Sequence, residues 1–401
     1  MHSPPAAAEM PANDGAEPDG QTPDYGDLAV VMSGGGARAA YQVGLLRYLA
    51  RRYPDLDVPI ITGVSAGAVN AAMLARHHGS FAQAVEELTA LWLELVPESV
   101  FRIDPLSLLG QVVRGGVQLV SGGARAAPRM RGMVSTDPLR VFLEEALSPV
   151  HGELTGIEYN LERGSLKAVA IITTSYTTGQ SVVWVQGRDI QTWERPQRRS
   201  IHCRLTVDHV MASTALPLFF PAVNVGDQWY GDGGMRLTAP LSPALHLGAH
   251  KILAISTRYP PTRKEAGRRA VDGYPPPAQV LGVLYNAIFL DLIDQDVMRM
   301  ERMNRLLRKL PEGERQGMRV VELLVVRPSQ DLGRLAGNYE PQLPASFRFL
   351  SRGLGTRETR SADLLSMVMF QPDYLRRLIE LGESDAEKQG DRIAQFMENG
   401  N

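Results

Sequence analysis

Three short segments of this chain carry residue types that could perform nucleophilic chemistry. Residues 34–36 are a run of three glycines, and glycines expose backbone N–H groups that can hold a negative charge. Residues 63–67 read GVSAG and place Ser65 between small neighbours. Residues 232–234 read DGG and place Asp232 in a glycine turn. A serine nucleophile needs a base and oxyanion donors, and the three segments contain a candidate for each part.

Ser65 lies where a predicted strand, 58–65, meets a predicted helix, 66–78. A strand that turns sharply into a helix pushes one side chain out at the apex, and Gly63 and Gly67 keep the nearby backbone clear. The helix N-terminus also favours negative charge that develops beside it. This context predicts that Ser65 is a nucleophile. The alternative interpretation is a helix-capping serine in a tight turn.

The glycine run follows another predicted strand, 28–33, and precedes a predicted helix, 39–53. Strand, turn and helix thus occur twice in succession, which is typical of an α/β fold with parallel strands. Neighbouring parallel strands place their following turns at the same carboxyl edge of the sheet, where α/β active sites form. We therefore expect the glycine N–H groups to lie beside Ser65.

The base is the remaining requirement, and histidine is the usual one. None of the eight histidines lies in a recognisable catalytic context, and two of them end the Ser65 helix, on the order of 15 Å from its start. Asp232 comes where the segment 228–235 runs from a predicted strand into a glycine turn, which frees its side chain to point at the site. A carboxylate with a pKa of about 4 is a weak base, but it can serve within hydrogen-bond reach of the serine. The alternative is that DGG is only a turn.

Other patterns predict the elements that position these segments. Strands are predicted at 167–175, 180–187, 251–257 and 319–328, a short helix at 206–217, and helices over much of 80–150. One of these helices is predicted to begin at Ser135 or Thr136, with Pro138 in its first turn, after a loose Gly- and Arg-rich stretch at 110–132. We therefore predict a catalytic core at 27–258, with a mostly parallel sheet and a helical insertion at about 80–165 over one face.

A C-terminal extension, 259–401, follows the core. It is predicted to contain a mobile loop at 258–278, a long helical pattern at 279–310, a strand and a helical tail. Within it, residues 299–310 form a basic amphipathic segment. For this segment we favour a core-packed helix with a solvated face over attachment to an anionic membrane surface.

Composition narrows the class of protein. The 401 residues are ample for a real core, and a formal net charge of −2 gives no electrostatic case for nucleic-acid binding. The single cysteine, Cys203, excludes an internal disulfide framework and fits a reducing compartment. Residues 1–26 contain no Lys or Arg and are predicted to be a disordered acidic tail. Without a secretory, transit or transmembrane pattern, we expect a cytoplasmic protein that could contact membranes peripherally.

The three segments occur together in a distinctive order: GGGAR at 34–38, GVSAG at 63–67 and DGG at 232–234. In this respect the chain resembles the patatin-like phospholipase family. The stretch ASTALPLFFP at 212–221 also looks like the family's segment before the aspartate. This resemblance covers about residues 27–258. Residues 362–386 show a weaker resemblance to the C-terminal tail of some bacterial patatin-like proteins.

The resemblance implies a three-layer α/β sandwich and a lipid acyl hydrolase of the phospholipase A or lysophospholipase type. It implies a Ser–Asp dyad, with Ser65 as nucleophile and Asp232 as base, and no metal or cofactor. Phospholipids, lysophospholipids or other lipid esters would be the substrates. The oxyanion donors would be the backbone N–H groups of Gly34, Gly35, Gly36, Ala37 and Arg38, and the motif glycines would be Gly63, Gly67, Gly233 and Gly234. Arg38 has the alternative role of tying down the glycine loop, and Ala39 stands where the family usually has glycine.

Other classes of protein remain as alternatives. The glycine run loosely fits a dinucleotide-binding fingerprint, but Asp55 and Asp57 precede the following strand rather than end it. A P-loop would need a Gly-Lys-Ser/Thr sequence after the glycines. An α/β-hydrolase with a histidine-containing triad normally builds several strands before its nucleophile, whereas Ser65 follows the second. A catalytically weak lipid-binding or regulatory protein on the same fold is the last alternative.

Overall fold

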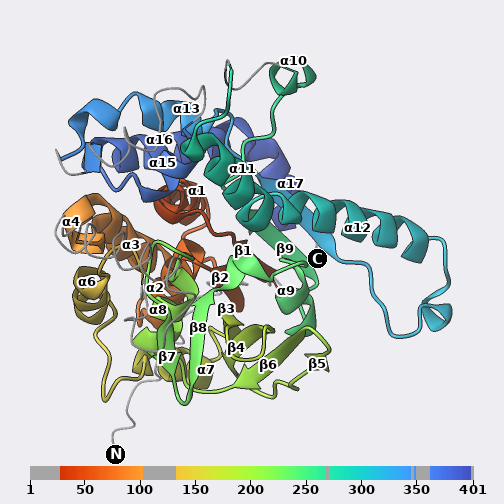
Figure 1. The fold of residues 1–401 in the computed structure, drawn as a ribbon. Coiled ribbons are helices and arrows are strands. Elements are labelled where there is room, and N and C mark those ends of the chain that lie inside the picture. The colour runs from red at the N-terminus through yellow and green to blue at the C-terminus, as the bar shows by residue number, and fades with distance from the viewer. Residues whose placement is uncertain are drawn as a thin grey trace, which may run out of the picture.

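The computed structural model of the chain describes residues 28–102, 132–267, 271, 273–344, 347–348 and 362–398. The predicted disordered tail at 1–26 lies outside these residues, as does the predicted loose stretch at 110–132 except for Gly132. Figure 1 shows a central sheet with helices on both of its faces.

The described strands form one mixed sheet in the order β10-β9-β1-β2-β3-β4-β6-β5, with β8 pairing to both β3 and β7. The strands are β1 (Leu28–Met32), β2 (Ile60–Val64), β3 (Ala168–Ser175), β4 (Ser181–Gly187), β5 (Glu194–Arg195), β6 (Arg198–His202), β7 (Val223–Val225), β8 (Gln228–Asp232), β9 (Lys251–Ile255) and β10 (Glu322–Val326). From β10 to β3 the strands are parallel, and β4 and β8 join β3 antiparallel. The short strands β5, β6 and β7 were not predicted, because they are largely exposed or half-buried and carry no apolar run.

Both faces of the sheet are apolar. In β1, Leu28, Val30 and Met32 belong to one buried cluster, whereas Ala29 and Val31 belong to a second cluster on the opposite face. A strand buried on both faces has an unbroken apolar sequence, as Leu28–Met32 does, because helices cover the two sides of a parallel sheet. The predicted three-layer α/β sandwich with a mostly parallel sheet is therefore confirmed.

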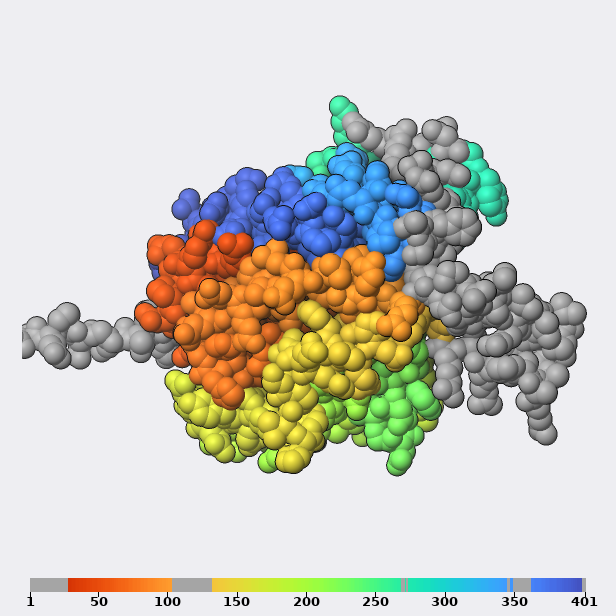
Figure 2. Space-filling view, turned by 90° about the vertical axis from the view of Figure 1, so that its left-hand side faces the viewer, coloured from red at the N-terminus to blue at the C-terminus, as the bar shows by residue number. Residues whose placement is uncertain are grey.

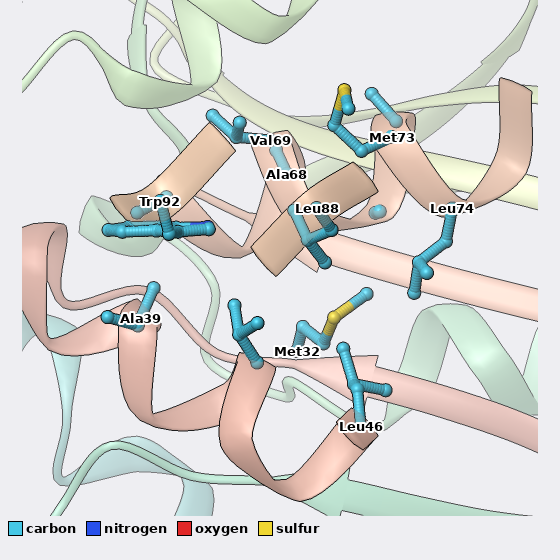
Figure 3. Packing of buried hydrophobic residues seen from close by; sticks show 14 of the residues in the cluster. Met32, Ala39, Leu46, Ala68, Val69, Met73, Leu74, Leu88 and Trp92 are labelled. Carbon is cyan, nitrogen blue, oxygen red and sulfur yellow. The ribbon is translucent and has the colours of Figure 1, made fainter. Parts of the chain in front are cut away.

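The described helices are α1 (Ala40–Arg52), α2 (Ala66–Arg76), α3 (Phe81–Glu94), α4 (Pro97–Val100), α6 (Asp137–Leu147), α7 (Thr155–Arg163), α8 (Val207–Thr214), α9 (Ser242–His246), α10 (Arg263–Ala266), α11 (Pro277–Phe289), α12 (Leu292–Leu307), α13 (Leu332–Gly337), α15 (Asp363–Val368), α16 (Pro372–Lys388) and α17 (Gly390–Glu398). The larger buried cluster joins the sheet to helices from both ends of the chain, among them α1, α2, α3 and α16. Figure 3 shows part of this cluster, where side chains around Met32, Leu46 and Leu88 interdigitate. Helices α9 and α12 contribute to the cluster on the other face.

The helical pattern 279–310 differs from its prediction in one respect. It is divided into α11 and α12 at Leu290 and Asp291, where the Asp291 carboxylate forms a 2.6 Å ion pair with Arg258 after β9. The neighbouring Asp294 pairs with both Arg258 and Arg327. These ion pairs fix the junction of the two helices to the strand ends. Among its described residues, the predicted loop 258–278 contains the four-residue helix α10 and the first two residues of α11.

The C-terminal extension is built into the same body as the core. Strand β10 continues the sheet beyond β9, and α16 packs along α1. This contact is close, because a Cβ on Gly44 would lie 1.9 Å from the carbonyl oxygen of Ile379. Figure 2 shows the C-terminal residues against the N-terminal helices.

Candidate active site

The register of β3 brings Asp232 to Ser65. Strand β2 pairs with β3 as far as Val64, which lies opposite Ile172, and Ser65 is the next residue. On the same side of β3, the antiparallel strand β8 places Asp232 opposite Thr173, one residue further along. Ser65 and Asp232 therefore meet end to end at the carboxyl edge of the sheet.

Ser65 occupies a strained turn between β2 and α2. Its backbone angles are φ 55° and ψ −132°, in a region that residues other than glycine rarely adopt. Its N–H donates to Ser213 Oγ at 2.9 Å, and that hydroxyl donates to the carbonyl of Ile172 at 2.6 Å. A Cβ on Gly63 would lie 2.3 Å from the carbonyl oxygen of Gly67, and one on Gly67 would lie 2.5 Å from the backbone of β1. Both glycines are therefore required by the packing beneath Ser65.

Asp232 is completely buried beside this turn. Its Oδ1 accepts a hydrogen bond from the N–H of Gly234 at 2.8 Å. Burial raises the pKa of the carboxyl group to about 7, although the Ser65 hydroxyl and the Gly234 N–H both lower it. The other oxygen, Oδ2, makes no well-formed hydrogen bond within the described part of the chain. The Ser65 hydroxyl therefore interacts with the Asp232 carboxylate, but the two groups do not form a hydrogen bond of good geometry. The next residue, Gly233, leaves no room for a Cβ, which would lie 2.2 Å from the carbonyl oxygen of Ile172.

The glycine loop lies on the other side of Ser65. A Cβ on Gly34 would lie 2.9 Å from the Ser65 Cβ, so glycine is required for this close approach. Gly35 and Gly36 have φ values of 137° and 57°, which favour glycine. Thr257 Oγ1 donates to the Gly34 carbonyl at 2.7 Å and holds the loop in place. Within the described ranges, the N–H groups of Gly35 and Gly36 donate to no protein acceptor, so both can donate to a ligand.

An apolar pocket opens beside Ser65 and the glycine loop. Its walls come from α2, the helical insertion, the segment after α8, α11 and the C-terminal extension; the lining residues are Gly35, Gly36, Ser65, Ala66, Val69, Leu91, Trp92, Leu95, Val100, Leu139, Phe142, Leu143, Thr214, Leu216, Phe220, Phe289, Met367, Val368 and Phe370. Pockets of this composition suit hydrocarbon ligands. The predicted insertion therefore contributes to the site as well as to the fold.

Comparison with known proteins decides the family. The model of the family described as patatin-like phospholipase matches residues 30–245. The chain belongs to the patatin-like phospholipase family. Membership supports lipid hydrolysis as its general activity.

Solved structures that match the chain include one bacterial and one human protein. VipD from Legionella pneumophila is 14% identical, over 91% of this chain and 67% of the VipD chain, with a TM-score of 0.36. The human GIVD cytosolic phospholipase A2 in complex with methyl gamma-linolenyl fluorophosphonate is 14% identical, over 93% of this chain and 59% of that chain, with a TM-score of 0.43. No curated protein sequence matches the chain.

In this patatin-like chain, Arg38 is turned away from Ser65 and toward the C-terminal extension. Its guanidinium forms a 2.7 Å ion pair with Asp363 and donates to Ser366 Oγ at 2.6 Å. Its backbone N–H donates to the carbonyl of Gly35 at 3.2 Å and is therefore already used, which removes Arg38 from the predicted oxyanion donors. The geometry supports the alternative role, in which Arg38 ties down the glycine loop. Ala37, beside it in the 3-10 helix η1 (Gly36–Ala39), is fully buried.

Two tyrosines interact electrostatically with Asp232. Burial and the charge of Asp232 raise the pKa values of Tyr176 and Tyr285. In the part of the chain that the structure describes, neither Ser65 nor Asp232 forms a hydrogen bond with a histidine. The buried His209, whose pKa falls to about 4 through burial, contacts Thr206 instead.

Two further features concern metals and membranes. Across the described ranges, no three or more His, Cys, Asp or Glu side chains are grouped so that they could hold a metal ion. No helix in these ranges has the length and apolar character needed to cross a bilayer.

Proposed function

We propose that the chain hydrolyses carboxylic ester bonds of lipids through Ser65 and Asp232, with phospholipids or lysophospholipids as substrates. The observation that carries this proposal is the meeting of Ser65 and Asp232 at the end of β3, with the Asp232 carboxyl group buried. Its pKa of about 7 suits proton transfer at neutral pH, because a general base works best when its pKa lies near the working pH. At its ordinary pKa of about 4, the carboxylate would be a weaker base.

The reaction proceeds through an acyl-enzyme. Ser65 Oγ attacks the ester carbonyl while its proton passes to the Asp232 carboxylate. The N–H groups of Gly35 and Gly36 hold the negative charge on the carbonyl oxygen. Asp232 then gives the proton to the leaving alkoxide, and an acyl group remains on Ser65. A water molecule that Asp232 deprotonates attacks the acyl group, and the fatty acid leaves as the serine regains its proton.

The pocket supports a hydrocarbon chain as the acyl group. The residues that the insertion and the extension contribute to its lining are almost entirely aliphatic or aromatic. Ser65 itself lies at the edge of the pocket. An acyl chain in this pocket would leave its carbonyl carbon beside the serine hydroxyl.

Active-site labelling and a lipid panel test the proposal. A fluorophosphonate probe is expected to label the wild type and the exposed-serine control Ser329→Ala, but not Ser65→Ala. Hydrolysis of phospholipid and lysophospholipid is expected to disappear in Ser65→Ala and to persist in the control. Labelling of Ser65→Ala would place the nucleophile elsewhere. Hydrolysis of triglyceride alone would exclude the proposed substrate class.

A further inference from the structure

Exposed large apolar side chains concentrate on α11, α12 and the residues that flank them. Nine of the sixteen such side chains in the described part of the chain lie between residues 274 and 318. They are Tyr274, Val280, Val283, Leu284, Met298, Met303, Leu306, Leu310 and Met318. A gathering of this kind marks an interaction surface, whereas single exposed apolar residues are ordinary.

Helix α11 is apolar on both sides. Its inner side buries Ala278, Gly282 and Tyr285. Its outer side carries Val280 and Val283, which are 54% and 58% exposed, and Leu284, which is 48% exposed. Their spacing of three and four residues places them in one stripe along the helix. The 13 residues of α11 include no charged side chain, so water meets an apolar stripe there.

The helix that carries this stripe packs with its inner side against the candidate active site. Phe289, near the end of α11, lines the pocket beside Ser65. A Cβ on Gly234 would lie 2.3 Å from the Phe289 ring, so α11 rests on the turn that follows Asp232. The Tyr285 hydroxyl also donates to the carbonyl of Pro217 at 2.5 Å. The outer side of α11 is therefore separated from the pocket by the width of one helix, about 10 Å.

Helix α12 follows α11 after two residues, and its exposed side carries positive charge. Its inner side buries Ile293, Val297, Met300 and Leu307, so the predicted core packing is present. Its outer side is not simply solvated and polar, because exposed methionines and leucines alternate there with cations. The exposed charged residues between 298 and 310 are Arg299, Glu301, Arg302, Arg305, Arg308 and Lys309. This is a local excess of positive charge on a chain whose net charge is −2.

We propose that the outer sides of α11 and α12 together dock on an anionic lipid surface and present the pocket to it. The α11–α12 face, as we name it, consists of Val280, Val283 and Leu284 with Met298, Met303 and Leu306 and the intervening arginines. Figure 1 shows α12 following α11 and running out to the right, past β9. Apolar side chains can enter the headgroup region while arginines pair with lipid phosphates. A second copy of the chain is a poorer occupant, because two such cationic faces would repel each other.

Vesicle sedimentation with the full chain tests this surface. The proposal rests on the proposed function, so binding is measured with Ser65→Ala, which separates docking from hydrolysis. Vesicles of phosphatidylcholine alone are compared with vesicles that also contain phosphatidylglycerol. We expect Arg302→Glu/Arg305→Glu to weaken binding to the anionic vesicles by at least about ten-fold and to reduce its salt dependence. We expect Val283→Ser/Leu284→Ser to weaken binding to both kinds of vesicle.

Matched controls lie on other surfaces. Arg188→Glu/Arg195→Glu reverses two exposed charges, and Val141→Ser/Val150→Ser removes two exposed apolar side chains. Both are expected to bind like the parent. When Ser65 is left intact, the face variants should hydrolyse a soluble short-chain ester at the wild-type rate but hydrolyse vesicle lipids poorly. Equal vesicle binding by face variants and parent would overturn the proposal. A dimer that the face variants convert to a monomer would assign the face to a second copy of the chain instead.

Discussion

Arg38 in the glycine loop and Asp363 at the start of α15 form a 2.7 Å ion pair, although 325 residues separate them in the sequence. The Arg38 side chain is only 4% exposed, and Ser366 accepts a second hydrogen bond from it. A Cβ on Gly36 would lie 2.0 Å from the carbonyl oxygen of Met367, so α15 also presses on the loop itself. The C-terminal extension thus holds the loop that carries the proposed oxyanion donors.

Removing the partner of Arg38 is expected to affect both folding and catalysis. Asp363→Asn should lower the free energy of unfolding by about 1–3 kcal/mol, because the mostly buried Arg38 guanidinium loses its counter-charge; the partial exposure of position 363 limits the loss. It should also lower kcat more than it raises KM, because the loop acts on the transition state. Asp373→Asn, at an exposed ion pair on α16, is the control and should change neither quantity. Unchanged kcat in a destabilised Asp363→Asn would limit α15 to a role in folding.

The acid limb of the pH–rate profile should reflect Asp232. The proposed base must be ionised, and burial raises its pKa to about 7. We expect kcat/KM for an ester without ionisable groups to rise with pH and to level off above about pH 7. An acid limb centred near pH 4, the range of an ordinary carboxyl group, would contradict a buried base.

The same burial should make Asp232 costly for stability. Its folded-state pKa lies above its unfolded value of about 4, so the folded chain retains a proton that the unfolded chain releases. The resulting destabilisation is absent below about pH 4, grows as pH rises between 4 and 7, and is complete above 7. It corresponds to at most about 4 kcal/mol. Asp232→Asn should therefore be inactive yet unfold at a higher temperature than the wild type at pH 8, with the difference vanishing near pH 4.

The sequence predicted that Ser65 and the glycine run lie at one edge of the sheet, because strand and turn rules position them, and the structure places Asp232 at the same edge. A strand, a tight turn and a helix force Ser65 outward, and parallel pairing of β1 with β2 places Gly34 beside it. The partners of these residues depend on long-range packing instead. Ser213 supports the Ser65 turn and Asp363 holds Arg38, yet no spacing in the sequence connects either of them to its partner. The Arg258–Asp291 ion pair at the junction of α11 and α12 is equally invisible to helical periodicity.

The close approach of the glycine loop to Ser65 makes Gly34→Ala a specific test of the geometry. The added Cβ would lie 2.9 Å from the Ser65 Cβ, so the serine or the loop must shift. We expect kcat to fall by about 100-fold or more, since small displacements of reacting groups have effects of this size. Gly313→Ala is the control, because a Cβ there meets nothing within 4 Å. Comparable losses in both variants, measured with the same ester, would show that the effect does not arise from crowding at Ser65.

The depth of the pocket should determine which acyl chains are hydrolysed. Val69 lies one turn along α2 from Ser65 and lines the pocket, and Figure 3 shows it near Trp92 of α3. In Val69→Phe the larger ring would fill space that a long chain needs. We expect kcat/KM for a palmitoyl ester to fall by about 10–200-fold, the range for one displaced methylene group, while that for an acetyl ester stays close to wild type. Overpacking should also lower the free energy of unfolding by about 1–3 kcal/mol, so Tm is measured alongside.

Val141→Phe, on the exposed side of α6, is the control and should leave the ratio of kcat/KM for the two esters unchanged. An equal loss on both esters in Val69→Phe would mean that the acyl chain leaves Ser65 by another route.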